Sequence, residues 1–365
     1  MHRGSNLKRW AGAVALIGFV GGSIGAFAAP AQAAAGPTVS LQRGTVIITG
    51  TAARDVIRVT MNADRLLVDV NFDGTIEAQF QRTRYQALRM LLGEGDDGVS
   101  VAGTGDVPVT ISGGGGNDAI GAVGNIGAMG TDDALTRISG DGGNDTIFAA
   151  TPGPITVQAG AGDDLVNGGG AGVGEETILL GDGSDRFVSS LNAFVGNRND
   201  VVDGGDGHDT MAVEGTFAAE SVGLSAKAGH LIINHDLRNR VDADNVEDVT
   251  YLGFGGLDES GGGDAIAVND LSGTDVRRFT PNFGMSQTGT VPNNSADTLT
   301  VRGTTGIDRI TVSGSGANTT VSGLRPTVTP VLLQPEDFLL IDTLDGDDIV
   351  DSSGLQPGLV QLLVR

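Results

Sequence analysis

Short runs of alternating apolar and polar residues recur along this chain, as in "TVIITG" near residue 45 and "DAIAV" near residue 264. The two-residue period is typical of half-buried β-strands. In the strongest copies an aspartate comes first, and the residue two places later is apolar. We expect that apolar residue to point into the core. These residues are Val99, Ile120, Ile147, Val166, Phe187 and Met211.

The aspartates end a glycine-rich segment that reads G-x-G-x-D, although the first glycine is shifted by one position in the third copy. The six aspartates are Asp97, Asp118, Asp145, Asp164, Asp185 and Asp209, and their spacings are 21, 27, 19, 21 and 24 residues. A period near 20 with a fixed turn motif indicates a solenoid. We therefore predict an all-β, parallel β-solenoid whose coils of about 20 residues each hold two short strands and two turns.

Composition and repeat strength divide the chain. The predicted regions are a signal peptide (1–33), N-terminal strands with a degenerate repeat (34–92), the central solenoid (93–215), an irregular β region with a weak repeat (216–300) and C-terminal degenerate repeats (301–365). Weaker copies of the motif centre on Asp55, Asp264, Asp308 and Asp348. For these outlying copies we favour structural turns over complete metal sites.

Three segments break the rhythm. Residues 64–92 alternate around an Asp-Gly pair, which predicts a hairpin. The loop that begins at Asp69 resembles an EF-hand, but Phe80 stands where a bidentate Glu is needed. Residues 216–250 read as short strands that close the ladder, and residues 280–298 as an exposed loop.

The N-terminal segment has the layout of a secretory signal peptide, with a basic start, an apolar run and an Ala-Gln-Ala cleavage site ending at Ala33. We expect a secreted, extracellular protein, or one associated with the cell surface, with no membrane span after cleavage. Removal of residues 1–33 leaves 19 basic and 45 acidic side chains, a formal charge of about −26. Such a charge argues against nucleic acid and anionic membranes as partners.

The acids are 36 Asp and only 9 Glu, and the chain has no Cys. Asp is favoured in tight turns and as a ligand of hard cations. A secreted chain without disulfides needs a core, a metal or both. Glycine turns present backbone carbonyls, and the aspartate adds a carboxylate. Two stacked turns together would offer the six to eight oxygens that Ca²⁺ takes.

The copies resemble the hemolysin-type calcium-binding repeat, the nonapeptide G-G-x-G-x-D-x-U-x of RTX proteins, where U is a large apolar residue. "GGGGNDAIG" at 113–121 and "GGDGHDTMA" at 204–212 match every defined position. The resemblance implies a parallel β-roll with several Ca²⁺ ions between turns. It also implies that the six aspartates are side-chain ligands. The implied turn positions, several giving carbonyls, are Gly93, Gly95, Gly114, Gly116, Gly143, Gly160, Gly162, Gly181, Gly183, Gly205 and Gly207. The motif comes once per coil, so we expect one column of ions.

Other interpretations stay open at this point. A metal-free Gly-Asp solenoid would need no ion, and a surface adhesin, a matrix protein or a polysaccharide-active enzyme on a β-helix would each suit a secreted solenoid. The mature chain has no Trp, and its Tyr residues are Tyr85 and Tyr251, so a sugar-stacking groove is poorly provided. No nucleophile, base and acid can be picked out, and two neighbouring histidines, His230 and His235, lack a third zinc ligand. We expect no catalysis, and the sequence does not name a protein or glycan partner.

Overall fold

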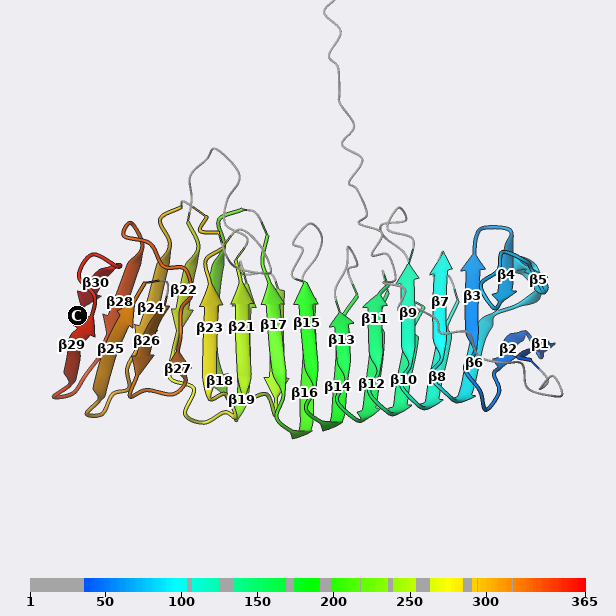
Figure 1. The fold of residues 1–365 in the computed structure, drawn as a ribbon, viewed down its shortest axis with the longest axis horizontal. Coiled ribbons are helices and arrows are strands. Elements are labelled where there is room, and N and C mark those ends of the chain that lie inside the picture. Colours follow the sequence, from blue (N-terminus) through cyan, green and yellow to red (C-terminus); the bar gives the residue numbers. More distant parts are fainter. Residues whose placement is uncertain are drawn as a thin grey trace, which may run out of the picture. The chain divides into compact units, whose positions relative to one another are not determined.

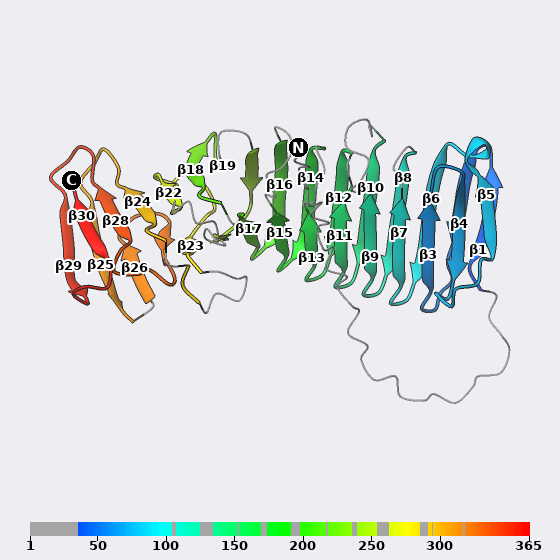
Figure 2. The same ribbon diagram turned by 90° about the horizontal axis from the view of Figure 1, so that it is seen from above.

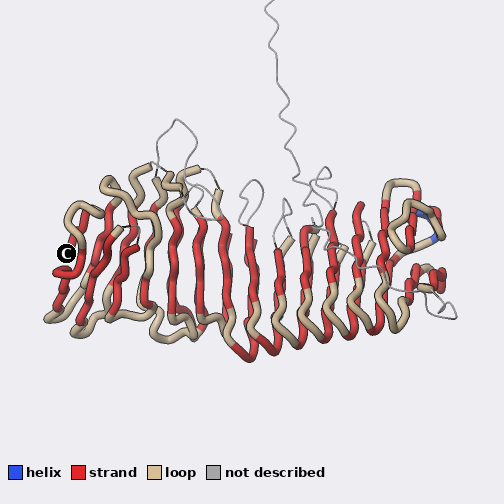
Figure 3. The backbone as a smooth tube through the Cα atoms, in the orientation of Figure 1, coloured by secondary structure: helices blue, strands red, loops and turns tan. Residues whose placement is uncertain are grey.

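Alternating burial along short strands builds two long β-sheets, and no α-helix occurs in the part of the chain that the computed structural model describes. That part comprises residues 36–103, 107–124, 134–151, 153–168, 174–190, 198–216, 218–235, 239–253, 263–284, 291–293, 295–316 and 318–365. The predicted signal peptide lies outside it. All described residues belong to one compact unit, Gly36–Arg365. Figure 3 shows how strands and connecting turns alternate along that unit.

Within the described residues, each sheet has 15 strands. In spatial order, sheet A contains β1 (Thr38–Gln42), β2 (Thr45–Thr49), β6 (Ala87–Glu94), β8 (Val109–Gly115), β10 (Thr136–Gly142), β12 (Ile155–Ala161), β14 (Glu176–Gly183), β16 (Arg198–Gly207), β20 (Asn239–Asp244), β19 (His230–His235), β18 (Ser221–Lys227), β22 (Ala265–Val268), β24 (Thr298–Arg302), β28 (Phe338–Asp342) and β30 (Gln361–Val364).

Sheet B contains, from the opposite end, β29 (Ile349–Leu355), β25 (Arg309–Ser315), β26 (Asn318–Ser322), β27 (Thr327–Val328), β23 (Arg278–Asn282), β21 (Asp248–Leu252), β17 (Thr210–Glu214), β15 (Arg186–Ser190), β13 (Leu165–Gly168), β11 (Thr146–Ala150), β9 (Ala119–Gly124), β7 (Gly98–Gly103), β3 (Val56–Met61), β4 (Arg65–Val70) and β5 (Ala78–Gln81). A single turn of 3-10 helix, η1 (Arg82–Arg84), follows β5.

The chain alternates between the sheets, and most neighbouring strands are parallel, so the fold is the predicted β-solenoid (Figure 1). The six predicted core residues fall in register in one column of sheet B, from Val99 to Met211, and each is at most 5% exposed. Their side chains lie in the single hydrophobic cluster that fills the space between the sheets. The aspartate-based alignment of the central coils is therefore confirmed.

The breaks in the rhythm are mostly antiparallel additions to the stack. Strands β3, β4 and β5 form antiparallel pairs, which confirms the predicted hairpin, and Asp69 accepts hydrogen bonds from the N–H groups of Asp73 and Gly74 instead of forming an EF-hand. Residues 216–250 form short strands, as predicted, but these strands do not end the stack. Strands β18, β19 and β20 form an antiparallel insertion within sheet A, and both sheets continue beyond it.

The segment predicted as an exposed loop, 280–298, is buried at both of its described ends. Phe283 and Asp297 are fully buried, and Asn293 is 5% exposed. Its middle, 285–290, lies outside the described residues. The Pro, Asn and Ser content favoured a loop, but Asn293 donates its side-chain amide to buried Asp297 and accepts the N–H of Ser295, so these polar residues are held inside.

Candidate metal centre

The turns that lead from sheet A to sheet B are built by glycines in left-handed backbone conformations. All eleven predicted turn glycines have φ between 94° and 151°. A side chain at these positions would also collide with the preceding coil, since a Cβ on Gly114 would lie 1.8 Å from the Gly93 carbonyl oxygen and one on Gly181 would lie 1.9 Å from that of Gly160. Backbone conformation and close stacking thus both require glycine. The stacking also places carbonyl oxygens between adjacent turns.

The six predicted aspartates form one continuous column across these turns, which we call the inner ladder. In each, Oδ1 accepts a hydrogen bond from the backbone N–H of the aspartate one coil earlier, over 2.7 to 2.8 Å. The ladder begins at the N–H of Asp55 and extends past Asp209, whose N–H donates to Glu247 Oε2 over 2.8 Å. Every one of the six is at most 3% exposed. Sequence reasoning missed Glu247 because it lacks the motif.

The second carboxylate oxygen separates the motif turns from the degenerate turns at Asp55 and Asp308. Oδ2 of all six motif aspartates is buried and accepts no hydrogen bond. In the degenerate turns, Oδ2 of Asp55 accepts the N–H of Thr51 over 2.6 Å, and Oδ2 of Asp308 accepts that of Thr304 over 2.7 Å. In both turns the donor lies four positions before the aspartate.

The backbone conformation four positions before the aspartate explains why only these turns supply a donor to Oδ2. In the six motif turns it has a positive φ and leaves no N–H aimed at Oδ2, whereas Thr51 and Thr304 are not among the positive-φ residues. The six residues are Gly93, Gly114, Asp141, Gly160, Gly181 and Gly205. Threonine turns therefore satisfy their own carboxylate, and glycine turns do not. A buried carboxylate oxygen without a donor calls for a ligand.

The column is electrostatically strained without a positive partner. Burial raises the pKa of Asp145 to about 7 and that of Asp118, Asp164 and Asp185 to about 6, and neighbouring carboxylates add to the increase. Burial likewise raises the pKa of Asp209 to about 6. The N–H bond to each Oδ1 lowers these pKa values but does not offset burial. The site favours a proton or a cation.

A metal ion at the inner ladder would have few side-chain ligands. Among the described residues, no group of three or more His, Asp or Glu side chains lies close enough together to hold a metal ion. A site between two turns must therefore combine two carboxylates with backbone carbonyl oxygens. That donor set contains only hard oxygen ligands, so it suits Ca²⁺ and is a poor site for zinc.

An outer ladder runs beside the inner one, on residues directly before the motif aspartates. The side-chain oxygens of Asp96, Asn117, Asn144 and Asp163 each accept the backbone N–H of the equivalent residue one coil later, over 2.7 to 3.0 Å. The hydrogen bonds of the two ladders point in opposite directions along the stack. Each turn is thus bonded to both neighbours through side chains as well as through strands.

A second buried ladder lies at the opposite edge, where turns lead from sheet B to sheet A. The N–H of Glu220 donates to Asp264, that of Asp264 to Asp297, and that of Asp297 to Asp337, over 2.7 to 3.0 Å. This corrects the prediction for Asp264, which precedes a strand of sheet A and so stands outside the motif column. The shared pattern Asp-x-apolar-x-apolar in "DAIAV", "DTLTV" and "DFLLI" could have revealed this ladder.

Most second oxygens of the opposite ladder have protein partners. Glu220 accepts the N–H of Thr216 over 2.6 Å and the Tyr251 hydroxyl, and it lies 3.2 Å from Nε2 of buried His235. Burial would raise the pKa of Glu220, but these hydrogen bonds together lower it. Asp297 and Asp337 also accept local donors, whereas Oδ2 of Asp264 accepts none. This edge is mostly satisfied by the protein itself.

Neither of the other two histidines in the described part of the chain belongs to a group of side chains that could hold a metal ion. His230 is half exposed and lies 2.8 Å from Asp242, and exposed His208 lies 3.8 Å from Asp248. Within the described ranges, no helix is long and apolar enough to span a membrane.

Comparison with protein-family models finds no match for this chain, and comparison with curated proteins finds none either. The resemblance to the hemolysin-type repeat therefore stays a prediction that rests on the motif residues.

Proposed function

We propose that this chain is a secreted calcium-binding protein in which Ca²⁺ ions lie between adjacent G-x-G-x-D turns and stabilise the fold. The observation that carries the proposal is the run of six buried Oδ2 atoms without a donor, all in glycine turns. The role is one of binding and structure, and we assign no catalytic residue. The ligands proposed are the six motif aspartates together with carbonyl oxygens of the turn glycines.

The spacing of the coils supports calcium over magnesium. Neighbouring strands lie about 4.7 to 4.9 Å apart, so equivalent oxygens on two stacked turns are about that far from one another. An ion midway between them would have bonds of about 2.4 Å, which is within the 2.3 to 2.6 Å range of Ca²⁺. Magnesium needs about 2.0 to 2.1 Å and a near-ideal octahedron. Magnesium should therefore substitute poorly.

The distribution of charge also favours cation binding in residues 93–215. Residues 93–215 hold 20 acidic and three basic side chains, a formal charge of −17, whereas residues 34–92 hold five acidic and seven basic ones. Compacting the acidic region without counter-ions is unfavourable. Bound Ca²⁺ would reduce this repulsion and offset the entropy of ordering the glycines.

Secretion would match the expected affinity. Extracellular calcium modules bind at about 10⁻⁴ to 10⁻³ M. A chain with such sites would remain loose before export, where free calcium is scarce, and would compact outside the cell. The export step rests on residues 1–33, which are outside the described part of the chain.

The test is a calcium titration of the purified chain, followed by circular dichroism, hydrodynamic radius and isothermal calorimetry. Asp145→Asn and Asp164→Asn should each weaken binding at the adjacent sites. Asp342→Asn is the matched control, because Asp342 pairs with Arg365 and Arg302 outside any turn motif. Identical spectra, radii and melting points in chelator and in millimolar calcium would refute the proposal. Equal effects of all three substitutions would refute the ligand assignment.

A further inference from the structure

The hydrophobic core is only half covered at the two ends of the stack. Eight partly buried apolar residues pack against the core, and seven of them lie in the outermost strands β1, β5, β29 and β30. Those seven are Val39, Leu41, Ala78, Phe80, Val350, Leu355 and Leu362. In the part of the chain that the structure describes, each of these four strands pairs on one side only. Figure 2 shows β1 and β5 at one end and β29 and β30 at the other.

The C-terminal end also exposes large apolar side chains outright. Leu344, Ile349, Leu363 and Val364 are each 49% to 52% exposed, and all four belong to the final coil. A solenoid normally ends in a coil with a polar outer face, because an uncovered coil is a ready surface for association. We call this surface the C-terminal face, and the surface formed by β1, β5 and η1 the N-terminal face.

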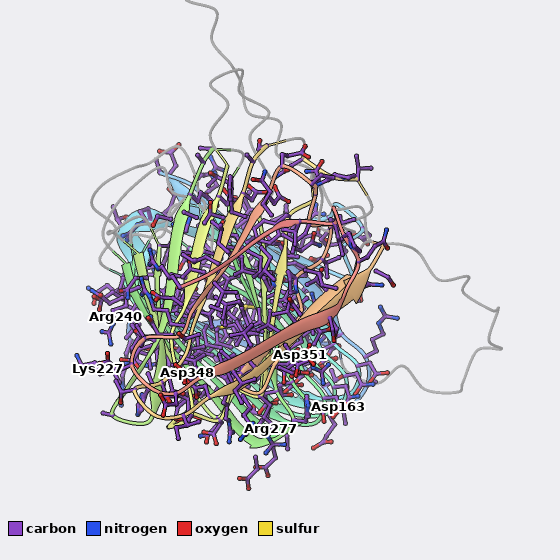
Figure 4. All side chains as sticks on the ribbon, turned by 90° about the vertical axis from the view of Figure 1, so that its left-hand side faces the viewer. Asp163, Lys227, Arg240, Arg277, Asp348 and Asp351 are labelled. Atoms are coloured by element: carbon purple, nitrogen blue, oxygen red, sulfur yellow. The ribbon has the colours of Figure 1, made fainter. Side chains whose placement is uncertain are left out.

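The two faces differ in charge, because the C-terminal face is acidic and the N-terminal region is weakly basic. Exposed side chains of the C-terminal face include Asp345, Asp347 and Asp351. Exposed side chains beside β1 and β5 include Arg65 and Arg84 together with Asp64 and Glu77, and residues 34–92 are the one region after the predicted signal peptide with a net positive charge. Figure 4 looks onto the C-terminal face, where Asp348 and Asp351 are labelled.

We propose that copies of this protein associate end to end, with the C-terminal face of one copy docked on the N-terminal face of the next. Edge strands of both sheets meet at each face, so docking would extend the sheets and cover the exposed apolar residues. Joining two C-terminal faces would bring acidic groups together, and joining two N-terminal faces would do the same for arginines. The contact is therefore heterologous, and repetition of it yields short filaments. This inference does not rest on calcium binding.

Sedimentation velocity of the full chain tests the proposal, over protein concentrations from about 1 to 200 µM at low and high salt and at fixed calcium. The average mass should rise with protein concentration and fall at 0.5 M salt, because salt screens the charges between faces. Leu363→Lys should reduce association at least fivefold at constant protein concentration. A chain that stays monomeric throughout would overturn the proposal.

Charge reversal identifies the faces. Arg65→Glu with Arg84→Glu makes the N-terminal face acidic, and Asp345→Arg with Asp347→Arg makes the C-terminal face basic. Each double variant alone should be monomeric, and an equimolar mixture should form assemblies in which the two variants alternate in equal amounts. The charge-matched control, Asp270→Arg with Asp275→Arg, lies between β22 and β23 and should associate like the unchanged protein.

Circular dichroism of each variant checks that the fold is kept. Self-association of either face variant alone would overturn the heterologous contact, as would the failure of their mixture to associate. The calcium titration is an independent measurement, so failure of the end-to-end contact would not refute calcium binding, and failure of calcium binding would not refute the contact.

Discussion

The turns that end at Asp164 and Asp308 both lead from sheet A to sheet B, and both aspartates donate their N–H to the carboxylate of a later coil. They differ in what meets the second oxygen. Thr304 donates its backbone N–H and its hydroxyl to Asp308, whereas the positive φ of Gly160 leaves Oδ2 of Asp164 without a donor. One turn satisfies its own carboxylate, and the other leaves a buried carboxylate oxygen without a donor. Under the proposed function, that oxygen is where the central region would bind Ca²⁺.

The largest effect should come from adding a methyl group to a glycine turn. Gly160 has φ +127°, and a Cβ there would lie 2.2 Å from the Asp141 carbonyl oxygen. Backbone strain and collision together should lower the free energy of unfolding by about 4 kcal/mol or more in Gly160→Ala. Urea denaturation in calcium measures this. Gly223→Ala is the control, since no atom lies within 4 Å of the added Cβ; similar losses in the two variants would contradict the turn geometry.

The next effect concerns pH and the chelated protein. Burial raises the pKa of seven aspartates to about 6 or 7; they are Asp118, Asp145, Asp164, Asp185, Asp209, Asp264 and Asp337. Between about pH 4 and 7 the folded state then binds more protons than the unfolded chain. Stability must therefore fall as pH rises through that window.

We expect the melting temperature of the chelated protein to rise by several degrees when the pH is lowered from 8 to 5, as measured by calorimetry. In millimolar calcium the trend should reverse, because protons compete with the ion for the carboxylates. A chelated protein that is less stable at pH 5 than at pH 8 would contradict the buried-charge argument.

Neutralising one carboxylate should have opposite effects in the two kinds of turn. In chelator at pH 8, Asp145→Asn removes a buried charge and should stabilise the fold by about 1 kcal/mol. Asp308→Asn replaces an acceptor that Thr304 needs and should destabilise it by about 1 to 2 kcal/mol. Denaturant midpoints measure both changes. The same sign in both variants would show that the turns do not differ as described.

The smallest loss of stability should come from removing the Thr304 hydroxyl group. Thr304→Val keeps the backbone N–H but removes the hydroxyl bonds to Asp308, which are 3.1 and 3.3 Å long. The expected loss is about 1 kcal/mol. Thr156→Val, on the outer face of β12, should change stability by less than about 0.5 kcal/mol. Thermal melts measure the stability of both variants. If Thr304→Val is as stable as the unchanged protein, the backbone N–H of Thr304 alone satisfies Asp308.

Periodicity predicted the solenoid because each coil repeats a physical requirement. The apolar residue two places after an aspartate must enter the core, so Val99 through Met211 align without knowledge of the loops between them. The positive φ at the motif glycines follows from residue type. The segments 125–133 and 169–173, which were predicted to be turns of variable length, lie outside the described residues.

Other features could not be predicted from the motif. Glu247 ends the inner ladder although nothing near it resembles G-x-G-x-D, because a longer side chain reaches the same N–H. Asp264 resembles a motif copy, but glycines precede aspartates at both edges of the stack, and only the sheet of the following strand tells them apart. Thr51 and Thr304, which donate to Asp55 and Asp308, are single residues whose role depends on the path of the turn.

The opposed inner and outer ladders bear on how such a protein changes length during evolution. In the inner ladder, a central coil offers a carboxylate oxygen to the coil before it and an N–H to the coil after it, as Asp145 does toward Asp118 and Asp164. Deleting or duplicating a whole coil by unequal recombination would leave each remaining donor with an acceptor. A deletion of half a coil would shift strands between sheets and break both ladders. Viable relatives of this chain should thus differ by whole coils, with smaller insertions confined to the edge opposite the glycine turns.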